Sequence, residues 1–171
     1  PRSMVRGDSC NTTLMLLPGH AGSHVDAPRH FLPKGRAVDD YPPETWLFKS
    51  PSVVEIAIEP GELIGPEDVA PELSREQPID LLLLKTGFSA WRQERIYWQQ
   101  GPGLSPSLGE YLKRNVSGLR AIGVDFLSIS CLTRREEGRE AHRTLLAREF
   151  LIFEDLALEN IRPGERLTEV I

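Results

Sequence analysis

The sequence predicts a single α/β domain with a central mixed β-sheet flanked by helices. Its 171 residues suit one domain with one hydrophobic core. Short apolar segments rich in β-branched residues alternate with segments that have helical spacing, a pattern typical of mixed α/β folds. The 14 glycines and 14 prolines are scattered between these segments and form no linker. We therefore expect residues 1–171 to form one structural unit.

Five segments have the composition or alternation of β-strands. Two of them combine β-branched and apolar residues between glycine or proline breaks, and a third alternates apolar residues along its length. A fourth is apolar throughout, which predicts a strand buried on both faces. In chain order the predicted strands are Thr12–Leu17, Ser52–Ile58, Ile79–Leu84 (the fully apolar one), Leu119–Phe126 (the alternating one) and Phe150–Phe153.

Three segments have the signals of helices. Pro66–Leu73 begins with proline and carries two acidic residues in its first turn. Ser107–Glu110 has the spacing of a capping box and leads into Tyr111–Arg114. Arg139–Arg148 places its apolar residues at helical spacing and precedes the last predicted strand.

Composition excludes several classes of function. With 20 basic and 25 acidic residues the chain has a net charge of −5, which gives no general attraction for nucleic acid or anionic membranes. Apolar runs such as Leu81–Leu84 are far shorter than the roughly 20 residues of a membrane-spanning helix. Two cysteines, Cys10 and Cys131, do not make a disulfide framework, so we expect a cytoplasmic protein, with Cys131 as a small buried residue.

Three of the four histidines lie in one eleven-residue stretch, which also contains a carboxylate. Imidazole and carboxylate together are typical ligands of zinc and similar divalent ions. A fully extended chain would separate His20 from Asp26 by about 20 Å, and a continuous helix would put His24 and Asp26 on opposite faces and be broken at Pro28. The stretch to His30 is therefore predicted to be a curled loop that binds metal. A surface loop that happens to be rich in histidine is the alternative on spacing alone.

The same stretch resembles the signature of the metal-dependent cyclase family, which includes bacterial kynurenine formamidases and isatin hydrolases. The family pattern is His-x-Gly-Thr-His-x-Asp-x-Pro-x-His-Phe, and residues His20–Phe31 depart from it only at Ser23, which keeps the hydroxyl group of threonine. The resemblance continues over nearly the whole chain. Its further segments are Leu81–Gly87, Pro102–Ser105, Gly123–Ser128 and Ala141–Leu146, with Glu154 twelve residues after the histidine of the last segment.

This resemblance implies a fold and a complete set of site residues. The fold would be the family's swivelling β/β/α arrangement, without the family's N-terminal strand. His20, His24 and Asp26 would hold one divalent ion, and Asp26 would bridge to a second ion held by His142 and Glu154. His30 would be the general acid and base. Zinc is the first choice of metal and manganese the second, with one or two ions per chain. Taken alone, His142 and Glu154 have the ordinary interpretation of a core histidine and a solvated glutamate.

The implied function is a metal-dependent hydrolase. It would cleave a C–N amide bond in a small formylated or cyclic amide through metal-activated water. The alternatives are an arylformamidase acting on N-formylkynurenine, an isatin-type ring-opening hydrolase, a dehydrating cyclase, and a metal-binding module without catalysis. The resemblance also implies a homodimer or homotetramer whose partner is a small-molecule substrate, with neither nucleic acid nor membrane involved.

Other conspicuous segments have simpler interpretations. Trp91–Trp98 mixes aromatic and basic residues, and we expect its aromatic rings in the core or at a subunit contact. Arg134–Glu140 is balanced in charge and is expected to be a solvated loop. Asp125 is expected to be structural, and Thr86 and Gly87 to lie at the mouth of the active site.

Overall fold

The computed structural model describes residues 1–73, 78–162 and 167–171. Its centre is a mixed five-stranded sheet with the strand order β1-β7-β6-β4-β2. Strands β2, β4, β6 and β7 run parallel to one another. Strand β1, at one edge of the sheet, is antiparallel to β7. The strands are β1 (His24–Asp26), β2 (Pro51–Glu55), β4 (Leu81–Lys85), β6 (Ala121–Val124) and β7 (Leu151–Glu154); β3 (Leu63–Ile64) and β5 (Gly103–Leu104) form a separate parallel pair. The predicted α/β class with a mixed sheet is confirmed.

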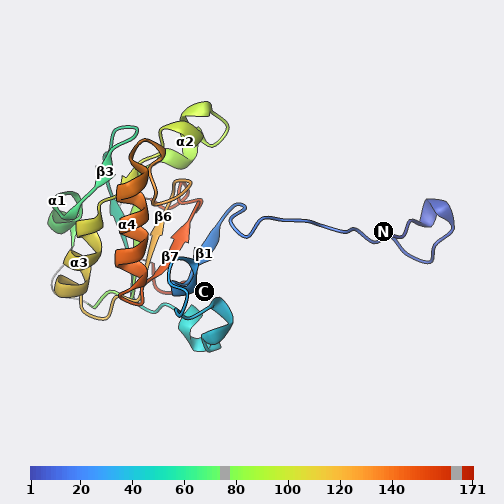
Figure 1. Cartoon of the computed structure of the whole chain (residues 1–171), viewed down its shortest axis with the longest axis horizontal. Coiled ribbons are helices and arrows are strands. Elements are labelled where there is room, and N and C mark those ends of the chain that lie inside the picture. The colour runs from blue at the N-terminus through green and yellow to red at the C-terminus, as the bar shows by residue number, and fades with distance from the viewer. Residues whose placement is uncertain (74–77, 163–166) are drawn as a thin grey trace.

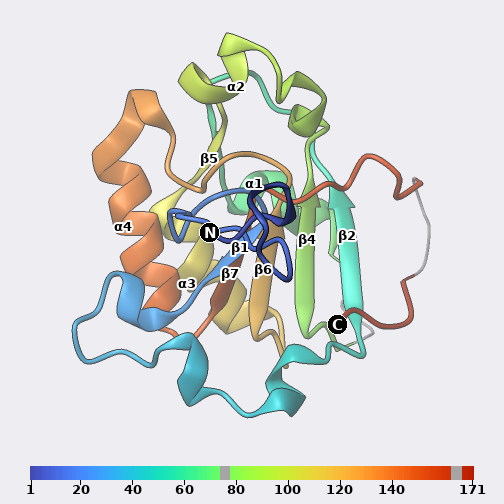
Figure 2. The same ribbon diagram turned by 90° about the vertical axis from the view of Figure 1, so that its right-hand side faces the viewer.

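Helices cover one face of this sheet. The α-helices are α1 (Pro66–Val69), α2 (Arg95–Gln99), α3 (Pro106–Asn115) and α4 (Arg135–Leu146). Figures 1 and 2 show α1, α3 and α4 on the same face, whereas α2 lies beyond one end of the strands. Short 3-10 helices connect the elements: Met4–Arg6, Pro28–His30, Val38–Asp40, Pro43–Trp46, Ala70–Glu72, Phe88–Trp91 and Leu132–Arg134.

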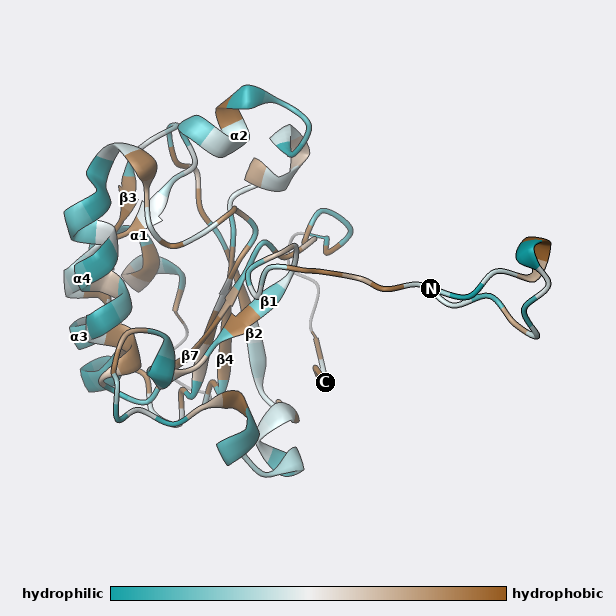
Figure 3. Ribbon diagram, turned by 45° about the vertical axis from the view of Figure 1, so that its right-hand side comes forward, coloured by the Kyte–Doolittle hydropathy of each residue, from teal (hydrophilic) through white to brown (hydrophobic). Residues whose placement is uncertain are grey.

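The core has two layers, one on each face of the sheet. Strand β4 shows this best, because Leu82 and Leu84 pack with the helices while Leu81 and Leu83 pack on the other face. All four leucines are at most 4% exposed, so the prediction of a strand buried on both faces is confirmed. In Figure 3 the brown colour of hydrophobic residues accordingly appears in strands at the middle of the domain.

The predicted strand Thr12–Leu17 is wrong. This segment is extended but pairs with no strand in the described part of the chain, and it leaves the body of the domain as an arm (Figures 1 and 3). Leu14 is 81% exposed and Leu16 is 97% exposed. β-propensity reports how well a side chain suits a half-buried pleated surface, and here no neighbouring strand supplies that surface.

Two helix boundaries also differ from the prediction. Helix α3 is capped by Ser105, whose hydroxyl accepts a hydrogen bond from the backbone N–H of Ser107, so the cap lies two residues earlier than predicted. The carboxylate of Glu110 does not reach back to close a capping box but pairs with Arg114 and Arg148. In the second case α4 begins at Arg135, so most of the expected loop Arg134–Glu140 is helical.

Pairs of opposite charge explain the longer α4. Arg139 contacts Glu136 at 2.8 Å and Arg143 contacts Glu140 at 3.4 Å, both at the i, i+3 spacing that places side chains on one face of a helix. The balance of charge that suggested a solvated loop therefore supports a solvated helix surface. Helix α4 is the longest helix in the described part of the chain, and within that part no helix has the length and hydropathy needed to cross a membrane.

Candidate metal centre and active site

The histidine-rich stretch forms a turn, a strand and a 3-10 helix, and the prediction of one curled loop is wrong for its centre. His24 and Asp26 lie in β1, where residues two apart share a face of the sheet. The antiparallel register places His24 opposite Glu154 of β7. The turn before β1 contains Gly22 at φ +71°, a left-handed conformation that glycine adopts readily, and brings His20 back beside His24.

His30 is held by the 3-10 helix that follows β1. Pro28 begins this helix, at a position where proline costs no backbone hydrogen bond, and the helix directs His30 toward Asp26. Phe31 follows it and packs between two histidines. Its ring stacks on His142 at a centroid distance of 4.6 Å and meets His30 edge-on at 4.8 Å.

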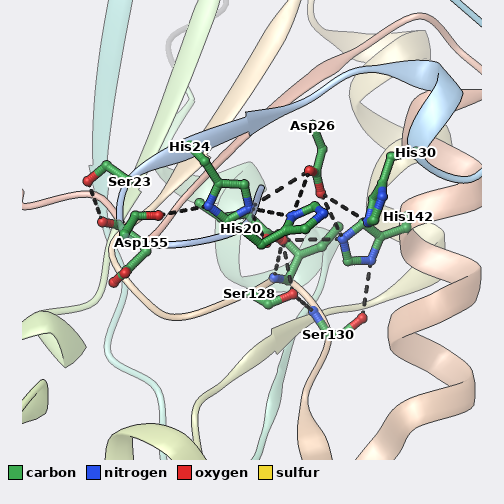
Figure 4. Close-up of polar contacts among 12 residues, drawn as sticks. His20, Ser23, His24, Asp26, His30, Ser128, Ser130, His142 and Asp155 are labelled. Atoms are coloured by element: carbon green, nitrogen blue, oxygen red, sulfur yellow. Dashed lines mark hydrogen bonds and ion pairs between the residues drawn. The ribbon is translucent and has the colours of Figure 1, made fainter. Parts of the chain in front are cut away.

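The remaining two predicted ligands come from a distant part of the sequence. Glu154 is the last residue of β7, and His142 lies on the buried face of α4. The site therefore lies at the carboxyl end of a parallel strand, where ligands usually bind in open α/β sheets. All six predicted site residues meet in one cluster, although His20 and Glu154 are 134 positions apart in the sequence. Figure 4 shows this cluster with Asp26 and the four histidines labelled.

Asp26 is the centre of this cluster. One of its carboxylate oxygens, Oδ1, lies 3.3 Å from His20 Nδ1 and 3.8 Å from His24 Nε2. The other, Oδ2, lies 3.6 Å from both His30 Nε2 and His142 Nε2. Each oxygen thus faces two imidazoles, an arrangement suited to a carboxylate that bridges two positions.

Glu154 has the same two-sided arrangement. Its Oε2 lies 3.5 Å from His24 Nε2, and its Oε1 lies 3.2 Å from His142 Nε2. Oε1 also accepts hydrogen bonds from the hydroxyl of Ser128 and the backbone N–H of Ile129. These two donors fix the carboxylate and leave Oε2 free to serve as a ligand.

Backbone carbonyls orient two of the histidines. His24 Nδ1 lies 2.8 Å from the carbonyl oxygen of Gly22, and His142 Nδ1 lies 3.0 Å from that of Gly138. A carbonyl only accepts, so each Nδ1 carries the hydrogen and each Nε2 faces the carboxylates. Metal-binding histidines in proteins are oriented in the same way.

The residues present fit a divalent metal ion. Asp26 Oδ2 is buried and has no hydrogen-bond partner among the described residues, which is costly unless a cation balances it. Two sets of three potential ligand atoms lie within 4.8 Å of one another: His20, Asp26 and His30, and His24, Asp26 and Glu154. Four imidazoles and two carboxylates are the donors that zinc and manganese accept.

Burial shows which side of the cluster is open. Asp26, His142 and Glu154 are each 3% exposed, whereas the side chains of His20 and His30 are 51% and 35% exposed. A small molecule can therefore approach past His20 and His30, and the carboxylates form the floor of the site.

Charge coupling shifts the pKa values of the metal-free cluster. The carboxylate of Glu154 raises the pKa of His24 to about 9, against the opposite effect of burial. Burial also lowers the pKa of His142, but Asp26 and Glu154 together raise it to about 9. The pKa of Glu154 falls to about 2, because hydrogen bonds from His142 and His24 outweigh its burial. Burial lowers the pKa of His30 below its usual 6.5, so His30 is neutral at pH 7.

The metal-free protein should lose stability as the pH rises from 6.5 to 9. His24 and His142 have folded-state pKa values near 9, above the 6.5 of the unfolded chain, so their protonation stabilises the fold fully below pH 6.5 and ceases to do so above 9. Thermal unfolding of chelator-treated protein at several pH values would measure this. A midpoint that stays level or rises over this interval would contradict the assigned charge states.

Gly138 allows α4 to approach the loop after β6 closely. A Cβ atom built on Gly138 would lie 2.6 Å from Ser130 Cα, and Ser130 Oγ lies 3.1 Å from His142 Nδ1. Gly138→Ala should therefore destabilise the fold by about 1–3 kcal/mol through overpacking, although alanine favours helix formation. Denaturant unfolding would measure the change, with exposed Arg135→Ala as the control on the same helix. A Gly138→Ala variant as stable as the unaltered protein would contradict the close packing.

The sequence prediction missed the residues that support the ligands. Ser128 and Ser130 contact Glu154 and His142, and Ser23 donates a hydrogen bond to the backbone next to Glu154. Serine-rich segments are common in loops, so the sequence carries no strong signal for these roles. Thr86 and Gly87 donate hydrogen bonds to Asp125, which supports a structural role for Asp125.

The chain is similar to one family of known proteins. The profile of a family described as "Putative cyclase" matches residues 7–130. A kynurenine formamidase of Geobacillus thermodenitrificans (strain NG80-2) is 32% identical over 162 residues, which cover 92% of this chain and 70% of that protein.

Two solved structures share the fold. Isatin hydrolase A from Labrenzia aggregata superposes with a TM-score of 0.70 at 22% identity, covering 85% of this chain and 63% of that one. A protein from Bacillus stearothermophilus described as a predicted metal-dependent hydrolase has a TM-score of 0.64 at 25% identity, covering 86% and 66%. The chain thus spans about two thirds of the length of these structures.

Proposed function

The chain belongs to the "Putative cyclase" family, and from this premise we propose that it is a metal-dependent hydrolase that cleaves the C–N bond of a small amide. One observation carries the proposal most. Asp26 is buried, and each of its carboxylate oxygens faces two imidazoles in a cluster that also contains Glu154. Such a set of donors serves a divalent cation far better than it serves the stability of a metal-free core.

We propose that the ligands divide into two groups that share Asp26. His20, His24 and Asp26 would hold one ion, and Asp26, His142 and Glu154 would hold a second when two are present. The contacts of Asp26 Oδ1 with His20 and His24, and of Oδ2 with His142, support this division. Zinc is the first choice and manganese the second, because imidazole and carboxylate suit both.

The proposed chemistry places the proton transfers on His30. A divalent ion bound here supplies an acidified water molecule and polarises the carbonyl group of the substrate. His30 lies on the open side of the cluster and is neutral at pH 7, so it can accept a proton and return it to the departing nitrogen. Phe31 holds the ring of His30 edge-on and so restricts its orientation.

The substrate class is proposed from the relatives. A relative named kynurenine formamidase and a structural neighbour named isatin hydrolase differ in whether the amide is formylated or cyclic. We propose that the substrate is a small formylated or cyclic amide. The more specific alternative is N-formylkynurenine. We also propose a homodimer or homotetramer in the cytoplasm, where the unpaired cysteines Cys10 and Cys131 remain reduced.

Turnover of three candidate substrates tests this proposal. Metal-loaded protein would be supplied with an N-formyl anilide, with N-formylkynurenine and with the cyclic amide isatin, and hydrolysis would be followed by absorbance. Hydrolysis of at least one of them, absent from chelator-treated protein, is the expected result. Metal binding without turnover of any of these amides would favour a binding module without catalysis.

A further inference from the structure

Asp155 occupies an unusual position directly beside a proposed metal ligand. It follows Glu154 at the end of β7 and has φ +56°, a left-handed conformation that non-glycine residues rarely adopt. Such a conformation persists only where the surroundings fix it. Asp155 is 8% exposed, and its backbone N–H donates to the carbonyl oxygen of Phe126 at 2.9 Å.

Three side chains from other parts of the fold converge on Asp155. Tyr97 OH donates to its carboxylate oxygen Oδ1, and Arg92 Nη2 donates to the same oxygen at 2.8 Å. Arg92 Nη2 also contacts the backbone carbonyl oxygen of Asp155 at 3.1 Å. The hydroxyl of Ser23 donates to that carbonyl oxygen at 2.6 Å (Figure 4). We refer to Ser23, Arg92, Tyr97 and Asp155 as the Asp155 network.

The bond from Ser23 closes the end of the strand pair β1 and β7, which carries three proposed ligands, His24, Asp26 and Glu154. His24 pairs with Glu154 in the antiparallel register of β1 and β7, so Ser23 and Asp155 stand at the next position along. The regular pairing ends at His24 and Glu154, and the hydroxyl of Ser23 takes over the role of a backbone donor. Each member of this closing pair is adjacent in sequence to one proposed ligand.

Tyr97 anchors the network in the hydrophobic core. Tyr97 is 1% exposed, belongs to α2 and stacks on Phe88 at a centroid distance of 6.0 Å. Burial raises the pKa of Tyr97, so its hydroxyl remains a neutral donor. The carboxylate of Asp155 is therefore anchored to a buried tyrosine of the hydrophobic core.

We propose that Ser23, Arg92, Tyr97 and Asp155 are positioning residues that hold His24 and Glu154 at the separation that metal binding requires. The inference rests on the proposed metal site and assigns no ligand role to the network itself. Partners behind the ligands typically change metal affinity by about 10–100-fold when they are removed. The Asp155 network acts through the backbone on two ligands at once, so we expect effects in that range.

A zinc competition titration with a chromophoric chelator tests the inference on the full chain. Ser23→Ala and Tyr97→Phe should each bind zinc about 10–100-fold more weakly, whereas Ser23→Thr, which keeps the hydroxyl, should bind like the unaltered protein. Tyr111→Phe makes the same chemical change on α3 and should leave zinc affinity unchanged. Val69→Ala, in the core far from the site, should lower the unfolding temperature without changing zinc affinity.

The outcomes separate this inference from the proposed function. Unchanged zinc affinity in Ser23→Ala and Tyr97→Phe, beside an unaltered protein that binds zinc, would overturn the positioning role alone. Weaker binding in Val69→Ala by the same factor would show that lost stability is the cause, and would also overturn it. If the unaltered protein bound no zinc, the proposed metal site would fail and this inference with it.

Discussion

Asp26→Asn should abolish metal retention and amide hydrolysis together. An asparagine has the same shape, but its amide nitrogen cannot be a ligand and its oxygen carries no charge. The substitution therefore removes the oxygen that faces His20 and His24 or the one that faces His30 and His142. We expect metal affinity to fall by more than about 100-fold, beyond the usual effect of residues that only support ligands. Elemental analysis after dialysis measures the loss.

Asp39→Asn is the matched control for this change. Asp39 is an exposed carboxylate in the 3-10 helix Val38–Asp40, so the same substitution there should leave the metal content unchanged. Circular dichroism would confirm that both variants keep the fold. An Asp26→Asn protein that kept its metal would contradict the placement of Asp26 at the centre of the site.

His30→Ala should lower the rate of hydrolysis by about 10²–10⁴-fold while the metal remains bound, because a positioned general acid and base contributes a factor of this size. The pKa of His30 is lowered by burial, so the unaltered residue is ready to accept a proton at neutral pH. Steady-state rates and metal content, measured on the same samples, separate the two effects. Added imidazole should restore part of the lost rate.

The competing role for His30 is that of a ligand. His20, Asp26 and His30 form one of the two sets of potential ligand atoms, so a metal ion at that position would use His30 directly. Loss of metal together with activity in His30→Ala would establish the ligand role in place of proton transfer. An unchanged rate would exclude both roles.

The sequence predicted which residues gather in the candidate site, but it predicted their geometry only in part. A cluster of three histidines and an aspartate is rare enough in sequence to indicate a metal site, and the resemblance supplied His142 and Glu154. The prediction of a curled loop for residues 20–30 is wrong at its centre because neither an extended chain nor a helix describes the whole stretch, which combines a turn, a strand and a 3-10 helix. His24-x-Asp26 is in fact the alternation of a strand, which places both side chains on one face.

The strand predictions succeeded where the predicted segment has neighbouring strands in the fold. Ile79–Leu84 overlaps β4, which lies between two strands and whose four leucines are buried on both faces of the sheet, so local pattern and tertiary environment agree. Thr12–Leu17 has similar propensity but no neighbouring strand, and it remains an exposed arm. The support of Glu154 by Ser128 and the anchoring of Asp155 by Tyr97 depend on residues brought together only by the fold, which no local pattern encodes.

The most direct test of the account is to titrate chelator-stripped protein with zinc or manganese while following hydrolysis of a small amide. The expected result is no turnover at the start and a rate that rises and levels off at one or two equivalents of metal per chain. A rate that does not depend on added metal would contradict the central claim that the Asp26 cluster is the metal centre of a hydrolase.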